Sequence, residues 1–180
     1  MIQTRAKLLG TRELAKPRNF TPAGKVESVE LDKEPPFITA AKEGKQRGKL
    51  KQGMEYEKKV HIALEQKFDY LYVPGPWLKF QSRGDRKPRM CQPDGLIVDL
   101  QSLHITIIEI KLKHTALAWW QTRRLYEPVI RKLFGPGFGY SICEIVKWFD
   151  LRTAFPERYS LSPNPHRKED GKFFVHILNS

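Results

Sequence analysis

The chain has 180 residues, of which 32 are lysine or arginine and 20 are aspartate or glutamate, giving a formal net charge of +12. This length fits one domain with a real core plus an extension, and the charge favours a polyanionic partner, most simply nucleic acid. Two widely spaced cysteines indicate neither a disulfide framework nor a zinc site, and the absence of an apolar membrane span or signal peptide predicts a cytoplasmic protein with no membrane partner.

Residues 1–50 differ in composition from the rest of the chain. They contain eleven basic and six acidic residues, four prolines and few aromatic residues. Such a segment cannot bury enough apolar surface to fold alone. The sequence therefore predicts a basic N-terminal arm over 1–50 and a folded domain over 51–180. An arm that tracks DNA or binds another subunit fits this composition, and so does a solubilising tail.

The first amphipathic helix is expected over residues 54–68. Glu57, Val60, Leu64 and Phe68 follow one another at intervals of three, four and four residues, which places them along one helical face. Glu57 therefore lies on, or beside, the face that should be buried. An acid in a first helical turn is also favoured by the helix dipole without any further role, so both interpretations of Glu57 stay open.

A strongly basic segment follows two short predicted strands, 70–73 and 77–81. Residues 79–90 contain five basic side chains against Asp85 alone, and the sequence predicts a loop there. Charge runs are usually just solvated, but this one leads directly into the most distinctive stretch of the chain and is well placed to hold phosphates. The predicted contacts are Lys79, Arg83, Arg86, Lys87 and Arg89.

That distinctive stretch is residues 92–113, where two β-branched, apolar-rich runs flank a short polar break and predict an antiparallel hairpin. With a four-residue loop over 100–103, Asp94 and Glu109 lie directly opposite each other, with Cβ atoms about 4.5–5.5 Å apart. Because side chains alternate along a strand, Lys111 shares a face with Glu109. A register slip of one residue would put the two carboxylates on opposite faces.

Two carboxylates in this position predict a cation site. Like charges placed opposite each other destabilise a sheet unless a cation lies between them. A hard cation such as Mg²⁺, or Mn²⁺ in its place, suits carboxylate oxygens. The alternative is that Glu109 and Lys111 are the solvated end of a strand, because an acid-x-Lys triplet occurs roughly once by chance in a chain of this size.

Pro93-Asp94 and Glu109-Ile110-Lys111 together resemble the motif of the PD-(D/E)XK nuclease superfamily, which is Pro-Asp, a variable spacer, and Asp or Glu-x-Lys. The resemblance covers about residues 53–148. It implies an α/β, restriction-endonuclease-like fold, with an αβββαβ core whose mixed central sheet is flanked by helices. It also implies a carboxylate on the first helix, which Gly53-x-x-x-Glu57 resembles.

The resemblance implies a role for each of these residues. Asp94 and Glu109 would hold the metal, with the Ile110 carbonyl as a further ligand. Glu57 would act through a metal-bound water or hold a second ion. Lys111 would orient the attacking water or stabilise charge that develops on the phosphate.

Residues 116–134 predict a second helix, with Thr115 as its N-cap. Pro128 should kink or break this helix near Glu127, because proline lacks a backbone N–H and restricts the residue before it. Arg123 and Arg124 belong to its basic face and are further predicted DNA contacts.

Gln121 is a polar residue on the apolar face of this helix. Many members of the superfamily, notably RecB-type nucleases, carry a Gln here that is followed by a Tyr four residues later. In this chain the Tyr is Tyr126, one residue farther away. The resemblance therefore implies a catalytic role for Gln121, behind the metal ligands, more firmly than one for Tyr126.

The remaining predicted elements are a strand over 139–148 and a final edge strand over 172–178, separated by the Pro-rich, polar residues 150–171. The order helix, strands, hairpin, helix, strand agrees with the αβββαβ core that the resemblance implies.

The sequence therefore predicts a Mg²⁺-dependent nuclease that hydrolyses phosphodiester bonds in DNA, most simply an endonuclease. Two enzyme alternatives stay open: an endonuclease subunit of a heteromeric transposase, which needs a partner recombinase, and a structure-selective resolvase or phage-type DNA-processing enzyme. A catalytically silent DNA-binding module with the same fold is the alternative outside enzymes. Besides DNA, the candidate partners are a second copy of the chain and a recombination or replication protein.

Overall fold

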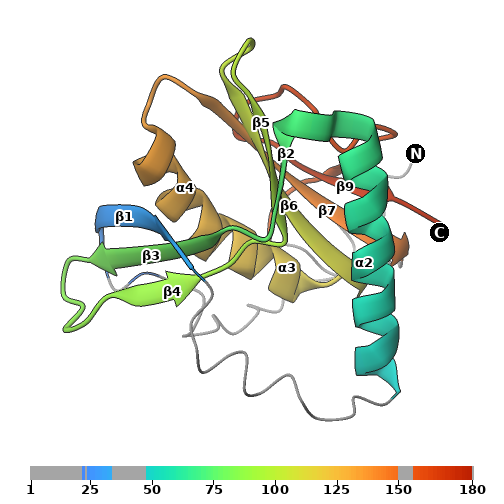
Figure 1. The fold of residues 1–180 in the computed structure, drawn as a ribbon, viewed down its shortest axis with the longest axis horizontal. Helices are drawn as coiled ribbons and strands as arrows, with labels where there is room; N and C mark the ends of the chain where they lie inside the picture. Colours follow the sequence, from blue (N-terminus) through green and yellow to red (C-terminus); the bar gives the residue numbers. More distant parts are fainter. Residues whose placement is uncertain (1–21, 23, 34–47, 150–155, 180) are drawn as a thin grey trace.

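The computed structural model describes residues 22, 24–33, 48–149 and 156–179, which form a mixed α/β structure with two sheets (Figure 1). The larger sheet has the strand order β2 (Tyr72–Pro74), β5 (Gly95–Asp99), β6 (His104–Lys113), β7 (Gly139–Trp148), β9 (Phe173–Ile177) and β8 (Ser160–Leu161). Strands β2, β5 and β6 are antiparallel neighbours, whereas β6, β7, β9 and β8 run parallel to one another. The central sheet is therefore mixed, as predicted.

The β5–β6 hairpin has the predicted register. Gly95 pairs with Ile108 and Asp99 with His104, which leaves a four-residue loop between the strands. Asp99 Oδ1 accepts hydrogen bonds at 3.1 Å from the backbone N–H groups of Gln101 and Ser102. This aspartate closes the turn through its own side chain, which explains how a loop without glycine can connect the strands.

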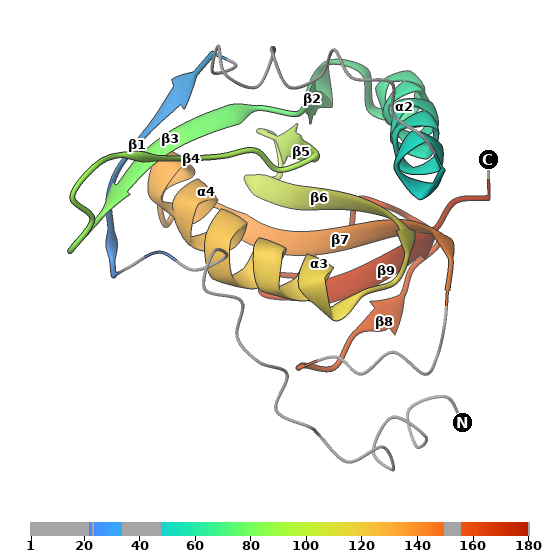
Figure 2. The same cartoon turned by 90° about the horizontal axis from the view of Figure 1, so that it is seen from below.

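Helices cover both faces of the larger sheet (Figure 2). Helix α2 (Lys49–Phe68) lies on one face, and α3 (Ala116–Gln121), η4 (Thr122–Tyr126) and α4 (Glu127–Phe134) lie on the other. The alternation of β6 divides its side chains between two apolar cores. Ile105 and Ile107 pack with the α3–α4 side, and Ile108 and Ile110 pack with α2.

Helix α2 begins five residues before the predicted start, at Lys49. Its buried side chains include Tyr56, Val60 and Leu64, while the Glu57 side chain is 45 % exposed and lies beside this stripe. Glu57 is also more than two turns from the helix start. The helix dipole therefore gives no reason for an acid at this position.

Part of the predicted N-terminal arm belongs to the folded unit, which corrects the boundary placed at residue 51. Strand β1 (Val26–Asp32) pairs antiparallel with β3 (Trp77–Ser82), and β3 pairs with β4 (Arg89–Cys91) to form the smaller sheet. Val26 is 6 % exposed and belongs to the core cluster that includes Val129 and Ile130 of α4, and the partly buried Val29 packs against the same cluster. Most of the remaining arm lies outside the described residues.

Two further predictions are corrected. The segment predicted as a loop over 79–90 is a hairpin, because β3 ends at Ser82 and the unpredicted strand β4 begins at Arg89. The last predicted strand, observed as β9, does not lie at the edge, since β8 pairs with it on the side away from β7.

Within the described ranges, no helix combines the length and apolarity needed to cross a membrane.

Candidate active site

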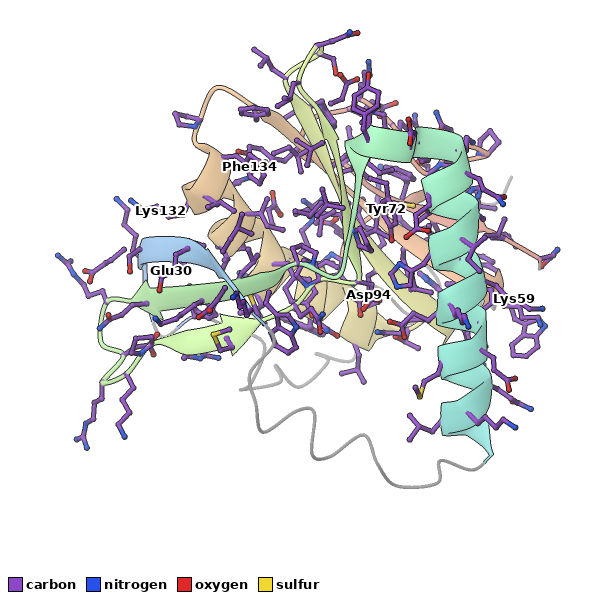
Figure 3. All side chains as sticks on the ribbon, viewed as in Figure 1. Glu30, Lys59, Tyr72, Asp94, Lys132 and Phe134 are labelled. Carbon is purple, nitrogen blue, oxygen red and sulfur yellow. The ribbon has the colours of Figure 1, made fainter. Side chains whose placement is uncertain are left out.

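The candidate site lies at the end of the β5–β6 hairpin opposite its connecting loop (Figure 3). Beyond the pair Gly95–Ile108, the next step of the same register brings Asp94 opposite Glu109. Asp94 Oδ2 accepts a hydrogen bond of 2.5 Å from the backbone N–H of Ile110. The Lys111 ammonium contacts Glu109 Oε1. The hairpin thus brings together the two carboxylates and the lysine that the sequence placed on one face.

Burial is the largest influence on the pKa values of Glu109, Asp94 and Lys111. It raises the pKa of the fully buried Glu109 well above the usual value, and the nearby Asp94 carboxylate raises it further. Burial also raises the pKa of Asp94, against the opposing effects of Lys111 and the Ile110 N–H. For Lys111, burial disfavours the charged form, but the charges of Glu109 and Asp94 outweigh it and raise the pKa. The site therefore holds a retained positive charge beside two carboxylates that repel each other.

The oxygen donors fit a hard divalent cation. Glu109 Oε2 is buried without a hydrogen-bond donor among the described residues, and a buried carboxylate oxygen left in that state is costly. The same part of the chain contains no cluster of three or more His, Cys, Asp or Glu side chains that could hold a metal by themselves. Mg²⁺ commonly binds through one or two carboxylates and completes its shell with waters and substrate phosphates. Asp94 and Glu109 match that requirement.

Glu57 approaches this group from α2. Its negative charge contributes to raising the pKa values of both Asp94 and Lys111. His61, one turn later on the same helical face, has Nε2 3.6 Å from Glu57 Oε1 and Nδ1 2.6 Å from the Tyr72 hydroxyl. The sequence prediction did not include His61, although its four-residue spacing from Glu57 indicates a shared face.

Tyr72 explains the glycine that follows Asp94. A Cβ atom at Gly95 would lie 2.6 Å from atoms of the Tyr72 ring, so a larger residue would displace this ring. The Tyr72 side chain in turn connects β2 to His61 on α2. The glycine of the Asp94-Gly95 pair therefore allows the helix and the strand to approach each other beside the candidate site.

Gln121 and Tyr126 are brought together by an irregular turn. The Gln121 Nε2 amide donates to the Tyr126 hydroxyl across an interval of five residues. Residues Thr122–Tyr126 form a π-helical turn, in which residues five apart are neighbours, and such turns are frequent at functional sites. Burial raises the pKa of Tyr126, and the charges of Glu109 and Asp94 raise it further.

The predicted interruption near Glu127 is therefore confirmed, but its form differs. The helical path widens before Glu127 and continues as α4, with Pro128 in its first turn. Proline cannot donate a backbone hydrogen bond, and a first-turn position does not require one. The Thr115 cap is confirmed, since its side chain accepts from Ala118 N at 3.3 Å.

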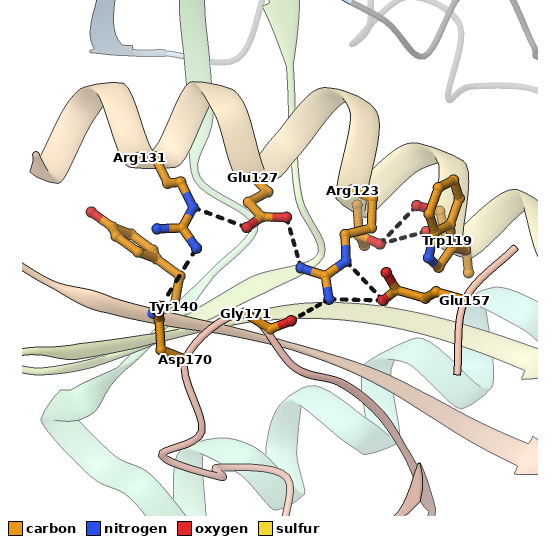
Figure 4. A network of polar contacts seen from close by, with 10 residues as sticks. Trp119, Arg123, Glu127, Arg131, Tyr140, Glu157, Asp170 and Gly171 are labelled. Carbon is orange, nitrogen blue, oxygen red and sulfur yellow. Dashed lines mark hydrogen bonds and ion pairs between the residues drawn. The ribbon is translucent and has the colours of Figure 1, made fainter. Parts of the chain in front are cut away.

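Arg123, one of the predicted DNA contacts, does not lie free on the basic face. Its guanidinium bonds Glu127 at 2.8 Å, Glu157 at 2.7 Å and the Gly171 carbonyl at 2.8 Å, and its side chain is 11 % exposed (Figure 4). It joins η4 to Glu127 of α4 and to the C-terminal segment that carries Glu157 and Gly171. Arg124 is exposed, and its guanidinium lies 5.6 Å from the centres of the Trp119 and Trp120 rings. Of these two predicted DNA contacts, Arg124 is the more exposed.

The basic residues of the β3–β4 hairpin fall into two groups. Those on the strands and at the start of the turn have protein partners: Lys79 pairs with Glu30 at 2.7 Å, Arg83 with Glu27 at 3.7 Å, and the Arg89 guanidinium lies 5.3 Å from the Phe80 ring centre. Arg86 and Lys87 lie exposed at the tip, and neither has an ion-pair partner in the described part of the chain. These two are the strongest candidates for phosphate contact.

The site can thus hold a hard cation between two carboxylates, with an ammonium beside them and Glu57 and the Gln121–Tyr126 pair around them. Such a group of residues can bind an anionic ester and position a water molecule. No family model, curated protein or solved structure matches the chain.

Proposed function

We propose that the protein is a Mg²⁺-dependent nuclease that hydrolyses phosphodiester bonds in DNA. One observation carries this proposal: the hairpin register brings Asp94 opposite Glu109, and Lys111 shares their face and contacts Glu109. A fully buried glutamate and a partly buried aspartate that repel each other are difficult to account for as structural residues alone. With a divalent cation between them they become a site for a phosphate group.

The element order supports a restriction-endonuclease-like fold as part of this proposal. Helix α2 is followed by β2, β5 and β6 of the larger sheet, then by α3, η4 and α4, and then by β7. Apart from the β3–β4 hairpin, which is inserted between β2 and β5, this is the αβββαβ order. The candidate site lies at one end of the three antiparallel strands, with α2 beside it.

In the proposed mechanism, Asp94, Glu109 and the Ile110 carbonyl would hold the ion, Mg²⁺ or Mn²⁺. When bound there, the ion would supply positive charge that polarises a phosphate and lowers the pKa of a water molecule. Glu57, held by its contact with His61, would orient the attacking water from the α2 side or would hold a second ion. Lys111 keeps its proton and stabilises the negative charge that develops on the phosphate oxygens.

Gln121 and Tyr126 act behind these groups. Tyr126 stays protonated, because burial and the neighbouring carboxylates raise its pKa. Its hydroxyl accepts a hydrogen bond from Gln121 and has its own proton available as a donor. The pair therefore keeps a neutral donor beside the carboxylates.

The test is cleavage of supercoiled plasmid, linear duplex and branched DNA, each with Mg²⁺, Mn²⁺ or EDTA. Nicking or linearisation that needs the divalent ion supports the proposal, and preferential cutting of branched DNA would specify a structure-selective resolvase. Binding of DNA without cleavage in any of the three conditions would contradict the proposal and indicate a silent DNA-binding module. Cleavage only after addition of a recombinase would indicate a transposase subunit.

Duplex binding should depend on the tip of the β3–β4 hairpin. The double variant Arg86→Ala/Lys87→Ala is expected to reduce the slope of log affinity against log salt concentration by about two phosphate contacts. The measurement is fluorescence anisotropy with a blunt duplex over a range of salt concentrations. Lys58→Ala/Lys67→Ala removes the same charge from exposed positions on α2 and should leave the slope nearly unchanged. Equal slopes for the two double variants would place the duplex contacts on another part of the surface.

A further inference from the structure

A pocket of about 250 Å³ lies between α2 and the last residues of β6 and β7. Tyr56 and Lys59 line it from α2, and Leu112, Lys147 and Trp148 line it from the sheet. Tyr56 directly precedes Glu57, and Leu112 directly follows Lys111. The pocket therefore lies where α2 and β6 carry Glu57 and Lys111, but Leu112 faces α2 whereas Lys111 faces the other side of the sheet, because side chains alternate along β6.

Trp148 forms an unusual wall for this pocket. Tryptophan is highly buried on average in folded proteins, yet Trp148 is 54 % exposed. Within the described residues no other aromatic ring stacks on the Trp148 indole. The Lys147 ammonium lies 5.4 Å from the centre of this ring. The Trp148 indole therefore offers a surface on which another planar group can stack.

The charged groups of the pocket favour an anionic ligand. Lys59 and Lys147 both line it, and neither forms an ion pair within the described part of the chain. The acidic residue of the pocket, Glu55, pairs with Lys51 at 3.7 Å. Proteins bind single-stranded nucleic acid with a basic groove along the phosphates and an aromatic side chain on which a base stacks. The bases of a duplex stack on one another, so their faces are not accessible to such a side chain. The volume is below the range of about 300–1,000 Å³ that suits drug-sized ligands, and it favours a single base over a larger group.

We propose that this pocket binds an unpaired nucleotide of the substrate, with its base stacked on Trp148 and its phosphates beside Lys59 and Lys147. This inference rests on the proposed nuclease function. It makes the preferred substrate a DNA with a single-stranded segment near the cleavage site, such as a flap, an overhang or a branch, over an uninterrupted duplex.

The experiment compares binding of a fluorescent oligothymidylate of about 20 nucleotides with binding of a blunt duplex of the same length, both in EDTA. Trp148→Ala should weaken oligothymidylate binding about tenfold, which is the loss expected for one stacked base, and should leave duplex binding within about twofold. Trp148→Phe should retain most of the affinity, because it keeps an aromatic face. Tyr70→Ala removes an aromatic side chain that is 80 % exposed beyond the other end of α2 and should change neither affinity.

A second variant tests the phosphate contacts. Lys59→Ala/Lys147→Ala should lower the salt slope for oligothymidylate by about one to two and leave the duplex slope unchanged. Unaltered melting temperatures show that the variants remain folded. Oligothymidylate binding by Trp148→Ala that equals the wild type, or an equal loss on both ligands, overturns the inference. If the wild-type protein cleaves plasmid but does not bind oligothymidylate, the nucleotide-pocket inference is overturned and the nuclease proposal stands. If the protein neither binds nor cuts any DNA, both proposals are rejected.

Discussion

Lys111→Ala is expected to cut DNA at least about a hundredfold more slowly than the wild type, the usual loss when one charged donor to the transition state is removed. Duplex affinity should change by less than about threefold, because one charge contributes little to a salt-dependent interaction spread over many phosphates. The Lys111 side chain is only 32 % exposed, and its ammonium contacts the buried Glu109 carboxylate instead of projecting into solvent. Initial rates of plasmid nicking with Mg²⁺, and anisotropy with a duplex in EDTA, measure the two quantities separately.

Lys113→Ala is the matched control, since Lys113 lies two residues farther along β6 on the same face and is exposed. It should change both rate and affinity by less than about threefold. Near wild-type cutting by Lys111→Ala would mean that the catalytic motif is wrongly assigned. A loss of duplex affinity as large as the loss of rate would make Lys111 a DNA-contact residue and would equally contradict its proposed role.

The second large effect should appear in stability. Glu109→Gln keeps the shape of the buried side chain, removes its repulsion with Asp94 and removes a metal ligand. In EDTA the variant should melt at or above the wild-type temperature. Mg²⁺ at about one hundred times its Kd should stabilise the wild type by about 2.7 kcal/mol, which corresponds to about 5–10 °C for a chain of this size. The variant should lose most of this gain, and Asp94→Asn should behave in the same way.

The direction of the pH effect follows from the raised pKa values of Glu109 and Asp94. A carboxyl group with a higher pKa in the folded state binds protons more readily there than in the unfolded chain. Its contribution to stability is therefore present at low pH and is lost as the pH rises above the usual value of 4.5. In EDTA, the advantage of Glu109→Gln over the wild type should be larger at about pH 8 than at about pH 5.

Thermal melts of these proteins, with and without Mg²⁺, measure both effects. Glu55→Gln removes an exposed carboxylate from α2 and serves as the control, since it should keep the full response to Mg²⁺. A Glu109→Gln protein that is clearly destabilised in EDTA and still responds to Mg²⁺ would identify Glu109 as a structural partner of Lys111. The proposal that Asp94 and Glu109 of the β5–β6 hairpin bind a metal ion would then be rejected.

The central hairpin was predictable because residues close together in the sequence determine its strands and its register. Alternation of apolar residues specifies the faces of each strand, and the loop length specifies the register, so Asp94 and Glu109 could be paired from residue numbers alone. The Thr115 cap and strand β7 were predictable for the same reason. Helix α2 was predicted with its start in error by five residues, since Gly48 and Gly53 obscure where the helix begins.

Other features depend on contacts between distant parts of the chain. The neighbours of Arg123 in the sequence are typical of a surface cation. Its side chain is covered only because Glu157 and Gly171, distant in the sequence, bond its guanidinium. A cluster of Thr106, Ser141 and His166 is similar: the Thr106 hydroxyl lies 3.1 Å from the Ser141 hydroxyl and 2.7 Å from His166 Nδ1. No local pattern relates these positions, which are separated by 25 to 60 residues.

The π-helical turn was not predictable from spacing rules, because those rules assume a regular helix. An interval of five residues between Gln121 and Tyr126 separates the two side chains on an α-helix and brings them together on a π-turn. A single additional residue can thus be accommodated inside the helix without displacing either side chain from the site. Sequence comparison by spacing alone would misjudge such a pair.

Strand β1 has a consequence for where this protein can be shortened. A chain that began at residue 51, the boundary suggested by composition, would lack the strand that pairs with β3 from Trp77 to Ser82. The N–H and C=O groups along that side of β3 would become an open edge, and the apolar side chains now covered by Val26 and Val29 would face water. An exposed edge beside an apolar surface is a template for pairing with other chains. A shortened protein would therefore tend to aggregate through the open edge of β3, and its loss of activity would be misread as evidence that the arm takes part in chemistry.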